Sequence, residues 1–330
     1  DDGLAESSGL RGYSTLIAAI EKGRTGTLGD IVATIQAEQD EIIRSPQAGV
    51  LVVQGGPGTG KTVVALHRAA YLLYTHRFPL EDQGVLVIGP NRVFLRYIEQ
   101  VLPSLGESGV EQVVLADLVP GVTFARPEDP VDSDLAARVK GDSRMSDVID
   151  RAAGDRERPL RSDLVVPFRS GYLRLRADET ARIVKQARRR FRRHNAGRRW
   201  VEGEVWAAMA ATWRGDEVSS SEVRADVRRL PDVREALERM WPVLTPAQLL
   251  HDLFGSRGLL RLAGAKVLTE AEVELLHRPR SASVADVVWT HDDVPLLDEA
   301  RALLGPKPRA RRREDDEVRT FGHIVIDEAQ

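Results

Sequence analysis

The sequence contains no cysteine among its 330 residues. Without thiols the chain can form neither disulfides nor thiolate metal sites, and this absence fits a reducing compartment. No apolar run approaches the roughly 20 residues that a membrane-spanning helix needs, and no basic segment followed by an apolar one opens the chain. We therefore expect a soluble, cytosolic (cytoplasmic) protein.

Aromatic residues are few, at 5%, and the formal net charge is only −3, so the overall charge gives no sign of nucleic-acid binding. Basic residues nevertheless cluster at positions 169–199, where Asp178 and Glu179 are the only acids. The densest stretch contains Arg188, Arg189, Arg190, Arg192 and Arg193. This basic patch can bind the phosphates of a nucleic acid, or it can be a solvated helix face, and the sequence leaves both interpretations open.

The length of the chain favours about two domains. The first residue is Asp1 rather than Met, and the last, Gln330, lies within an acidic motif. We therefore expect the sequence to be a piece of a longer polypeptide.

A glycine-rich segment matches the phosphate-loop pattern G-x-x-x-x-G-K-[ST] in full. Its glycines allow successive backbone N–H groups to surround phosphates, Lys61 supplies a positive charge to the β and γ groups, and Thr62 offers a hydroxyl to Mg²⁺. The sequence therefore predicts a nucleotide site. It consists of Gly55, Gly56, Pro57, Gly58, Thr59, Gly60, Lys61 and Thr62.

An acidic element, "DEAQ" at residues 327–330, follows the apolar run "HIVI". Asp327 can hold Mg²⁺ through a water molecule, and Glu328 can orient or deprotonate an attacking water. Acidic residues are common at strand ends, so this element alone does not indicate a nucleotide site. It does so in combination with the phosphate loop upstream. Together the two motifs predict a nucleotide hydrolase.

Short apolar runs predict strands at residues 50–53, 84–88, 110–115 and 323–326, with a helix at 62–74. This order is typical of an α/β fold with a parallel, doubly wound sheet. Two β-α-β steps of about 30 residues each would join the loop to the acidic strand. The actual separation is far greater, which predicts an inserted domain at about 121–285.

The inserted region is expected to be mostly helical. Helix start signals occur at Ser219, at Thr245 before Pro246, and at Thr269, and residues 163–175 form a possible extended piece. Trp206, Met209 and Trp213 lie at helical spacing. They can form a core seam, which is the favoured interpretation, or a surface on which bases stack.

Several segments carry a family resemblance: "TIQAEQDEIIR", "VLVVQGGPGTGKTVVALHRAAYLLY", "VLVIGPNRVFLRYIEQVLPSLGE", "DVPLLDEA" and "HIVIDEAQ". The chain resembles the first RecA-like domain, a P-loop NTPase domain, of UvrD-type superfamily 1 helicases. It is most similar to the HelD-like ATPases that bind RNA polymerase in Gram-positive bacteria. The resemblance implies a helical lead-in at 1–30, a RecA-like first part at 31–120, the insertion at 121–285, and a return to the RecA-like domain at 286–330.

The resemblance also implies roles for single residues. Gln39 would read the adenine of ATP, with Gln36 as a competitor and a solvated helix position as the alternative for either. Gln330 would sense the γ-phosphate and act with Lys61, Asp327 and Glu328 in catalysis. Asn91 would contact a single-stranded backbone, or it simply caps the following helix.

The implied function is an ATP- and Mg²⁺-dependent transcription factor that helps to release or recycle RNA polymerase from nucleic acid. The insertion would be an arm that enters the polymerase cleft. A second RecA-like domain of the same protein would supply arginines to the ATP site, so this chain alone is expected to hydrolyse ATP poorly. The alternative is a UvrD-type DNA helicase or translocase in DNA repair.

Overall fold

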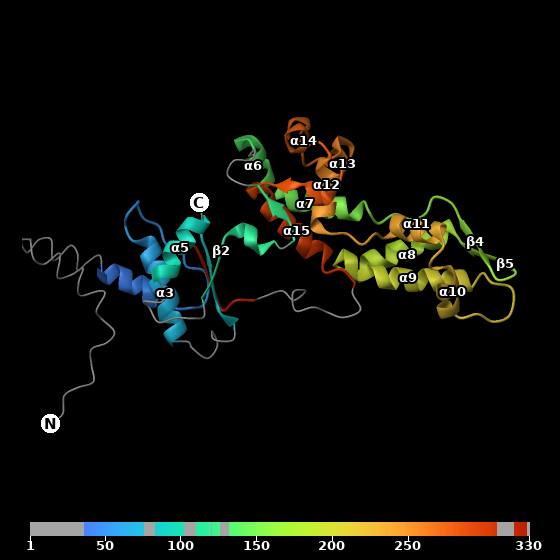
Figure 1. Cartoon of the computed structure of the whole chain (residues 1–330), viewed down its shortest axis with the longest axis horizontal. Coiled ribbons are helices and arrows are strands. Elements are labelled where there is room, and N and C mark those ends of the chain that lie inside the picture. Colours follow the sequence, from blue (N-terminus) through green and yellow to red (C-terminus); the bar gives the residue numbers. More distant parts are fainter. Residues whose placement is uncertain are drawn as a thin grey trace, which may run out of the picture. The chain divides into compact units, whose positions relative to one another are not determined.

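A computed structural model describes residues 36–75, 83–101, 110–119, 121–125, 132–308 and 320–328. The lead-in expected at 1–30 and the predicted sensor Gln330 lie outside these described residues. The chain divides into two compact units. The first combines the described residues up to Val114 with those after Arg319, and the second spans Leu115–Val318 (Figure 1).

The first unit contains a three-stranded parallel sheet in the order β2-β1-β7. Its strands are β1 (Val85–Ile88), β2 (Val110–Val113) and β7 (His323–Ile326). In the register, Val85 lies opposite Val110 on one side and His323 on the other. The last strand of the chain therefore returns beside the first, which confirms an α/β arrangement with a parallel sheet.

The core of the first unit forms where α3 (Lys61–Thr75) and α5 (Arg92–Val101) meet the sheet. All four residues of β1 are buried, as expected for the central strand of a sheet that is covered by helices. Leu66, Leu72 and Ile98 supply much of the packing from the helices. This core holds β7 in place, and the acidic residues Asp327 and Glu328 directly follow that strand.

The strand predicted at residues 50–53 is wrong: this segment has no regular secondary structure. Val50 and Val52 are 94% and 76% exposed. An apolar run becomes a strand only when another strand pairs with it, and none does so among the described residues. Ile324 and Ile326, which share one face of β7, are 50% and 56% exposed, so that face of the strand is only partly covered.

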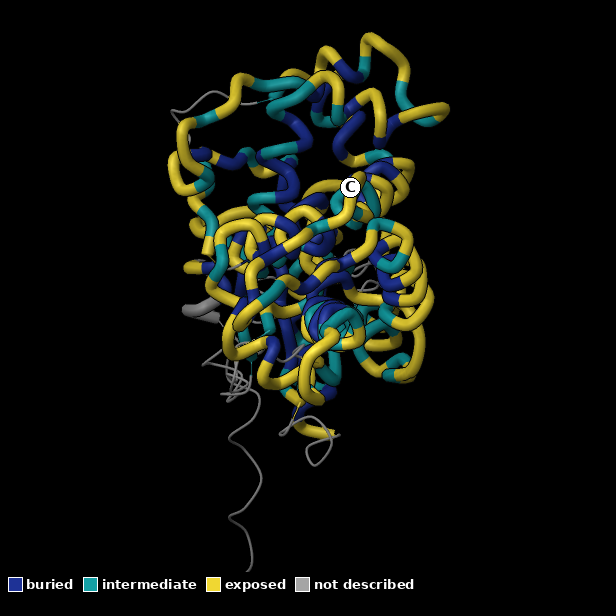
Figure 2. The backbone as a smooth tube through the Cα atoms, turned by 90° about the vertical axis from the view of Figure 1, so that its right-hand side faces the viewer, coloured by how far each residue is buried: buried dark blue, intermediate teal, exposed yellow. Residues whose placement is uncertain are grey.

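The second unit is mostly helical. Figure 2 shows buried and exposed backbone alternating along the chain, as expected for helices with one face against a core. Its α-helices are α6 (Asp134–Lys140), α7 (Arg144–Gly154), α8 (Ala177–Arg190), α9 (His194–Ala210), α10 (Ser220–Val227), α11 (Pro231–Met240), α12 (Pro246–Phe254), α13 (Arg257–Ala263), α14 (Glu270–Leu276) and α15 (Val294–Leu304). Short 3-10 turns are η2 (Leu115–Leu118), η3 (Val284–Asp286) and η4 (His291–Asp293).

Two small sheets accompany these helices. The extended piece predicted at 163–175 is an antiparallel hairpin of β4 (Leu164–Phe168) and β5 (Gly171–Leu175). Its two-residue turn holds Arg169 at a φ of 50°, in the left-handed region that two-residue hairpin turns use. The other pair, β3 (Thr123–Phe124) and β6 (Val288–Trp289), is parallel and joins segments from the two ends of the unit.

The predicted helix starts are confirmed. Ser219, Thr245 and Thr269 are the N-cap residues of α10, α12 and α14. Each forms a capping box, in which the cap side chain accepts from the backbone N–H three residues on and that residue's own side chain bonds back. Pro246 occupies the first turn of α12, where its missing N–H costs no hydrogen bond.

The division between the units differs from the predicted insertion borders of 121 and 285. The segment "DVPLLDEA", which the family resemblance places in the RecA-like return at 286–330, mostly forms α15. This helix packs against α12 and α7 and buries Leu297 and Ala300 completely. Because those apolar contacts are within the helical unit, residues 286–308 belong to that unit and the return to the sheet begins only near 319.

Trp206 and Met209 are buried in the core between the hairpin and helices α8 to α11, and Trp213 packs against that core. The Trp213 ring meets Phe168 edge-on at a centroid distance of 5.1 Å. The core interpretation of this seam is therefore confirmed. Within the described ranges no helix is both long and apolar enough to cross a membrane.

Candidate nucleotide site

The phosphate loop owes its shape to its glycines. Gly58 and Gly60 have φ angles of +74° and +86°, a region that residues with a β-carbon rarely adopt. At Gly55 a β-carbon would lie 2.7 Å from the Thr59 hydroxyl oxygen, too close for any side chain. The pattern of glycines therefore reflects both backbone conformation and space.

The loop encloses the side chain of Lys61. Its Nζ donates to the carbonyl oxygens of Gly55 and Gly56, each at 2.9 Å, and the Thr59 hydroxyl donates to Gly56 at the same distance. Lys61 is also the first residue of α3, whose N-terminal N–H groups carry partial positive charge. An ammonium group and a helix N-terminus thus meet at one glycine-rich loop, the arrangement that binds phosphate.

The second motif reaches the loop through Asp327. The Thr62 hydroxyl donates a hydrogen bond of 2.7 Å to Asp327 Oδ2. The backbone N–H of Asp327 donates to the carbonyl of Ile88, so the β1–β7 ladder sets its position. The structure therefore brings together the two residues predicted to share Mg²⁺.

Glu328 follows in an unusual conformation. Its φ is 54°, and its backbone N–H donates to Asp327 Oδ1 at 3.1 Å. A residue with a β-carbon pays roughly 1–2 kcal/mol in the left-handed region. Strain of this kind concentrates at functional sites, and here it falls on the predicted general base.

Gln39 lies in the helix at residues 36–44 and contacts the loop. Its side-chain nitrogen donates to the carbonyl of Thr59 at 3.2 Å. For Gln36, also half-buried, no hydrogen bond to the loop is found among the described residues. Of the two competing glutamines, the structure therefore places Gln39 beside the phosphate loop.

Arg68 is the residue near this site that sequence reasoning missed. It is buried on α3, and its guanidinium donates to four backbone carbonyl oxygens at the end of the Gln39 helix. These belong to Ile42, Ile43, Ser45 and Pro46, at 2.8 to 3.2 Å. Burial lowers the pKa of Arg68, but the acceptors at a helix C-terminus favour its charged form.

The contacts of Arg68 connect α3 to the helix that carries Gln39. A signal was present in the sequence: a single charged residue on an otherwise apolar helix face, between Leu66 and Leu72. His323, at the start of β7, has its pKa lowered by burial and by the positive charge of Arg68. His67, the neighbour of Arg68 on α3, is half-buried.

Asn91 acts as a helix cap. Its side-chain oxygen accepts from the backbone N–H of Phe94 at 2.9 Å at the start of α5. The capping interpretation is therefore confirmed, and a contact with a nucleic-acid backbone stays a prediction.

A protein-only metal cage does not occur here: the described residues contain no group of three or more His, Cys, Asp or Glu that could hold an ion. The pair formed by Thr62 and Asp327 fits Mg²⁺, which commonly takes one or two protein oxygens and fills its other positions with phosphate oxygens and water. The site is thus suited to a metal–nucleotide complex rather than to a free ion.

No protein-family model matches this sequence, and a search of curated proteins gives no significant match either.

Proposed function

We propose that this chain is the nucleotide-binding part of a HelD-like, RNA polymerase-associated ATPase. Its RecA-like unit binds ATP with Mg²⁺, and its helical unit is the arm that engages the polymerase. ATP turnover would then help to release or recycle the polymerase from nucleic acid.

The observation that carries the ATPase proposal is the contact between Thr62 and Asp327. It joins the end of a phosphate loop to the end of a parallel strand, across 265 positions of sequence. In P-loop nucleotide hydrolases, a hydroxyl and a carboxylate in this arrangement hold Mg²⁺ against the β- and γ-phosphates. Lys61 and Gln39 lie at the same loop and would contact the phosphates and the adenine of ATP.

The ATPase proposal is tested by equilibrium titration of the chain with a fluorescent ATP analogue, with Mg²⁺ and with EDTA. We expect saturable binding that Mg²⁺ strengthens. Failure to bind in either condition would contradict it. A second titration with a fluorescent GTP analogue shows whether the site prefers adenine to guanine, as we expect if Gln39 contacts the base.

The partner proposal has a separate test. The chain is titrated against RNA polymerase core and against single-stranded and duplex oligonucleotides at physiological salt. Tight binding to the polymerase, with weak and salt-sensitive binding to DNA, supports a polymerase arm. Tight binding to DNA without any polymerase binding would instead support a UvrD-type helicase or translocase.

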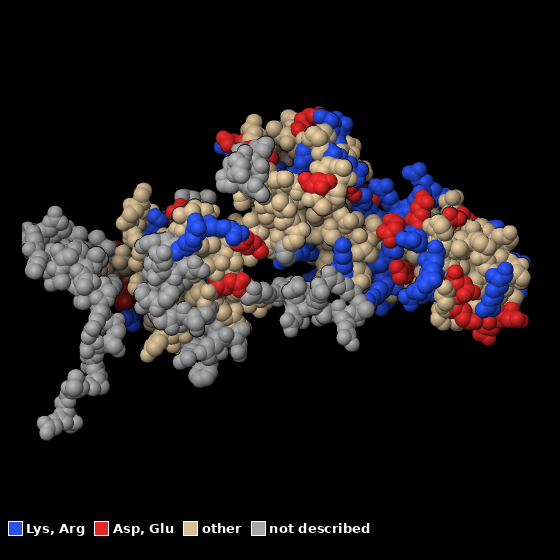
Figure 3. Space-filling view, in the orientation of Figure 1, with Lys and Arg blue, Asp and Glu red and all other residues tan. Residues whose placement is uncertain are grey.

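The basic patch is the observation that favours this second candidate. Figure 3 shows basic side chains gathered over the α8–α11 end of the helical unit, with acidic ones among them. Arg188 is held by Glu157, and Arg190 lies over the Phe191 and Trp200 rings. Arg189, Arg192 and Arg193 are exposed, and these can meet the phosphates of a nucleic acid.

A further inference from the structure

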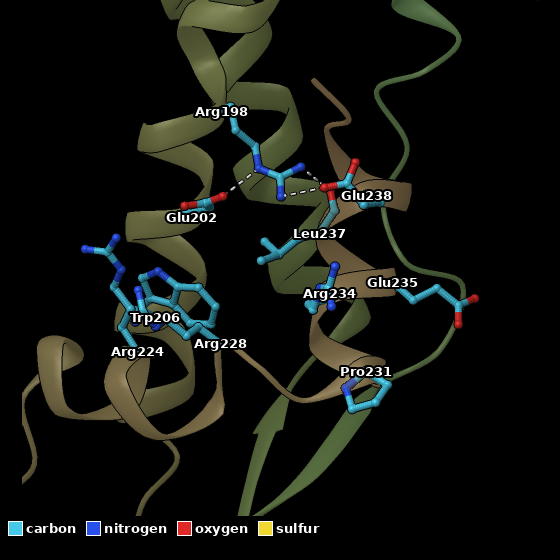
Figure 4. A pocket seen from close by; sticks show the side chains of 10 residues that line it. All are labelled: Arg198, Glu202, Trp206, Arg224, Arg228, Pro231, Arg234, Glu235, Leu237 and Glu238. Carbon is cyan, nitrogen blue, oxygen red and sulfur yellow. Dashed lines mark hydrogen bonds and ion pairs between the residues drawn. The ribbon is translucent and has the colours of Figure 1, made fainter. Parts of the chain in front are cut away.

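A hollow of about 570 Å³ lies in the helical unit between α9, α10 and α11. Its volume is in the range of small-molecule sites. Trp206 of α9 forms part of the wall, and Figure 4 shows its indole ring beside the arginines of α10. The hollow is unrelated to the phosphate loop, which belongs to the other unit.

The acidic side chains around the hollow are already paired. Arg198 binds Glu202 at 2.6 Å and Glu238 at 2.9 Å, as the dashed lines in Figure 4 show. Glu235 is paired with Arg239 at 2.8 Å. Among the described residues, none of these three carboxylates is paired with another arginine of the hollow.

Three further arginines line the same hollow: Arg224, Arg228 and Arg234. Within the described part of the chain their guanidinium groups make no ion pair and no hydrogen bond. Arg224 lies on α10 and Arg228 is its C-cap, four residues on, so both side chains leave the same face. Arg234 lies on α11 and lines the same hollow (Figure 4).

Like charges four residues apart on a helix repel each other, and a third cation from α11 adds to that repulsion. An anion in the hollow would relieve it. The guanidinium group binds phosphate with two parallel N–H donors, so three such groups around one hollow can saturate a phosphate's oxygens. The indole of Trp206 would supply an apolar surface to the rest of the ligand.

We propose that this hollow, the arginine pocket, binds a phosphate group through Arg224, Arg228 and Arg234. The ligand is a free phosphorylated compound or the phosphate backbone of a nucleic acid, because both present the same group. This proposal does not depend on the proposed ATPase function.

The test uses the full chain carrying Lys61→Ala, so that the phosphate loop does not bind the probe. Inorganic pyrophosphate is titrated by calorimetry into this parent and into a variant that also carries R224Q, R228Q and R234Q. The matched control carries R138Q, R161Q and R214Q instead, which remove the same charge from equally exposed arginines of the helical unit outside the pocket and outside the basic patch. A further variant, Arg234→Lys, keeps the charge but removes the planar fork.

We expect the pocket variant to lose at least about tenfold in affinity for pyrophosphate, the control to bind like the parent, and Arg234→Lys to bind with intermediate affinity. A repeat with a single-stranded thymidine oligonucleotide identifies the source. A loss confined to the pocket variant there indicates a nucleic-acid backbone, whereas a loss with pyrophosphate alone indicates a free compound. No binding by the parent, or equal losses in the pocket variant and the control, would overturn the proposal.

Discussion

The hydroxyl of Thr62 lies 2.7 Å from Asp327 Oδ2, although 265 positions separate the two residues. Thr62 is the second residue of α3, at the end of the phosphate loop, and Asp327 directly follows β7. The helical unit is therefore inserted between two halves of one site. A carboxylate and a hydroxyl at this separation can share one metal ion once phosphate oxygens arrive.

Asp327→Asn is expected to abolish the part of nucleotide affinity that depends on Mg²⁺. The amide keeps the size of the side chain and can still accept from Thr62, but it lacks the charge that holds the cation. The measurement is the affinity for a fluorescent ATP analogue with Mg²⁺ and with EDTA. Asp286→Asn, at an exposed position of the helical unit, is the control and should retain the Mg²⁺ effect. An unchanged Mg²⁺ effect in Asp327→Asn would contradict the site.

Lys61→Ala is expected to weaken nucleotide binding at least about tenfold, because a charge-assisted hydrogen bond to phosphate is lost. In the structure the Lys61 ammonium is satisfied by the carbonyls of Gly55 and Gly56. Binding must exchange these acceptors for phosphate oxygens, while the fold does not depend on them. Lys185→Ala, on an exposed face of α8, should change neither affinity nor melting temperature. If Lys61→Ala bound ATP as the parent does, the loop would not be a nucleotide site.

Arg68→Met is expected to destabilise the first unit by about 3 kcal/mol, since four partly buried carbonyls at the end of the Gln39 helix lose a charged donor. The variant should also bind ATP more weakly, because that helix positions Gln39 against the loop. Thermal unfolding and the ATP titration measure the two effects. Arg96→Met, at an exposed position of α5, is the matched control.

Addition of Gln39→Ala to Arg68→Met separates these effects. If Arg68 acts through Gln39, the two changes will weaken ATP binding together by less than the sum of their separate effects. Independent, additive losses would show that Arg68 has only a structural role.

The sequence predicted the motifs well because each depends on local chemistry. Glycine conformation defines the phosphate loop, and a side-chain cap fixes the start of α12 at Thr245. Prediction from the sequence failed where contacts between distant segments determine the secondary structure and the packing. Residues 50–53 have the composition of a strand but no strand beside them, and "DVPLLDEA" matched a family segment but packs as α15.

Arg68 and the arginine pocket were missed for a different reason. A single charge on an apolar helix face marks Arg68 as unusual, but its acceptors are backbone carbonyls, which no sequence pattern identifies. The pocket arginines resemble any other arginine of an Arg-rich chain until the structure shows which of them lack a carboxylate. Local patterns cannot reveal either property.

Asp293 is the centre of a buried charge network in the helical unit. Its side chain is fully buried and pairs with Lys140 at 2.8 Å and with Arg278 at 2.9 Å. The Arg278 guanidinium also lies 4.5 Å from the centre of the Trp289 ring. Lys140 in turn reaches Asp132, so the network connects α6, η4 and the segment after α14.

Asp293→Asn is expected to lower the free energy of unfolding of the helical unit by about 3 kcal/mol, because the buried Lys140 and the half-buried Arg278 lose a shared counter-charge. Urea titration followed by circular dichroism measures the change. Asp298→Asn, which removes a carboxylate that is 57% exposed, should change stability by no more than about 0.5 kcal/mol. Equal effects of the two variants would contradict a stabilising network.

The same network predicts how the stability of the unit depends on pH. Burial by itself raises the pKa of Asp293, but the charges of Arg278 and Lys140 outweigh it and hold the pKa below its ordinary value of 3.8. A carboxyl group whose pKa is lowered by folding stabilises the native state above its unfolded pKa, and this contribution disappears as the pH falls through the folded pKa. The stability difference between the parent chain and Asp293→Asn should therefore be constant from neutral pH down to about pH 4 and then shrink. Urea midpoints measured over that range give the result, and a difference that persisted unchanged below pH 3.8 would show that Asp293 is not ionised in the folded protein.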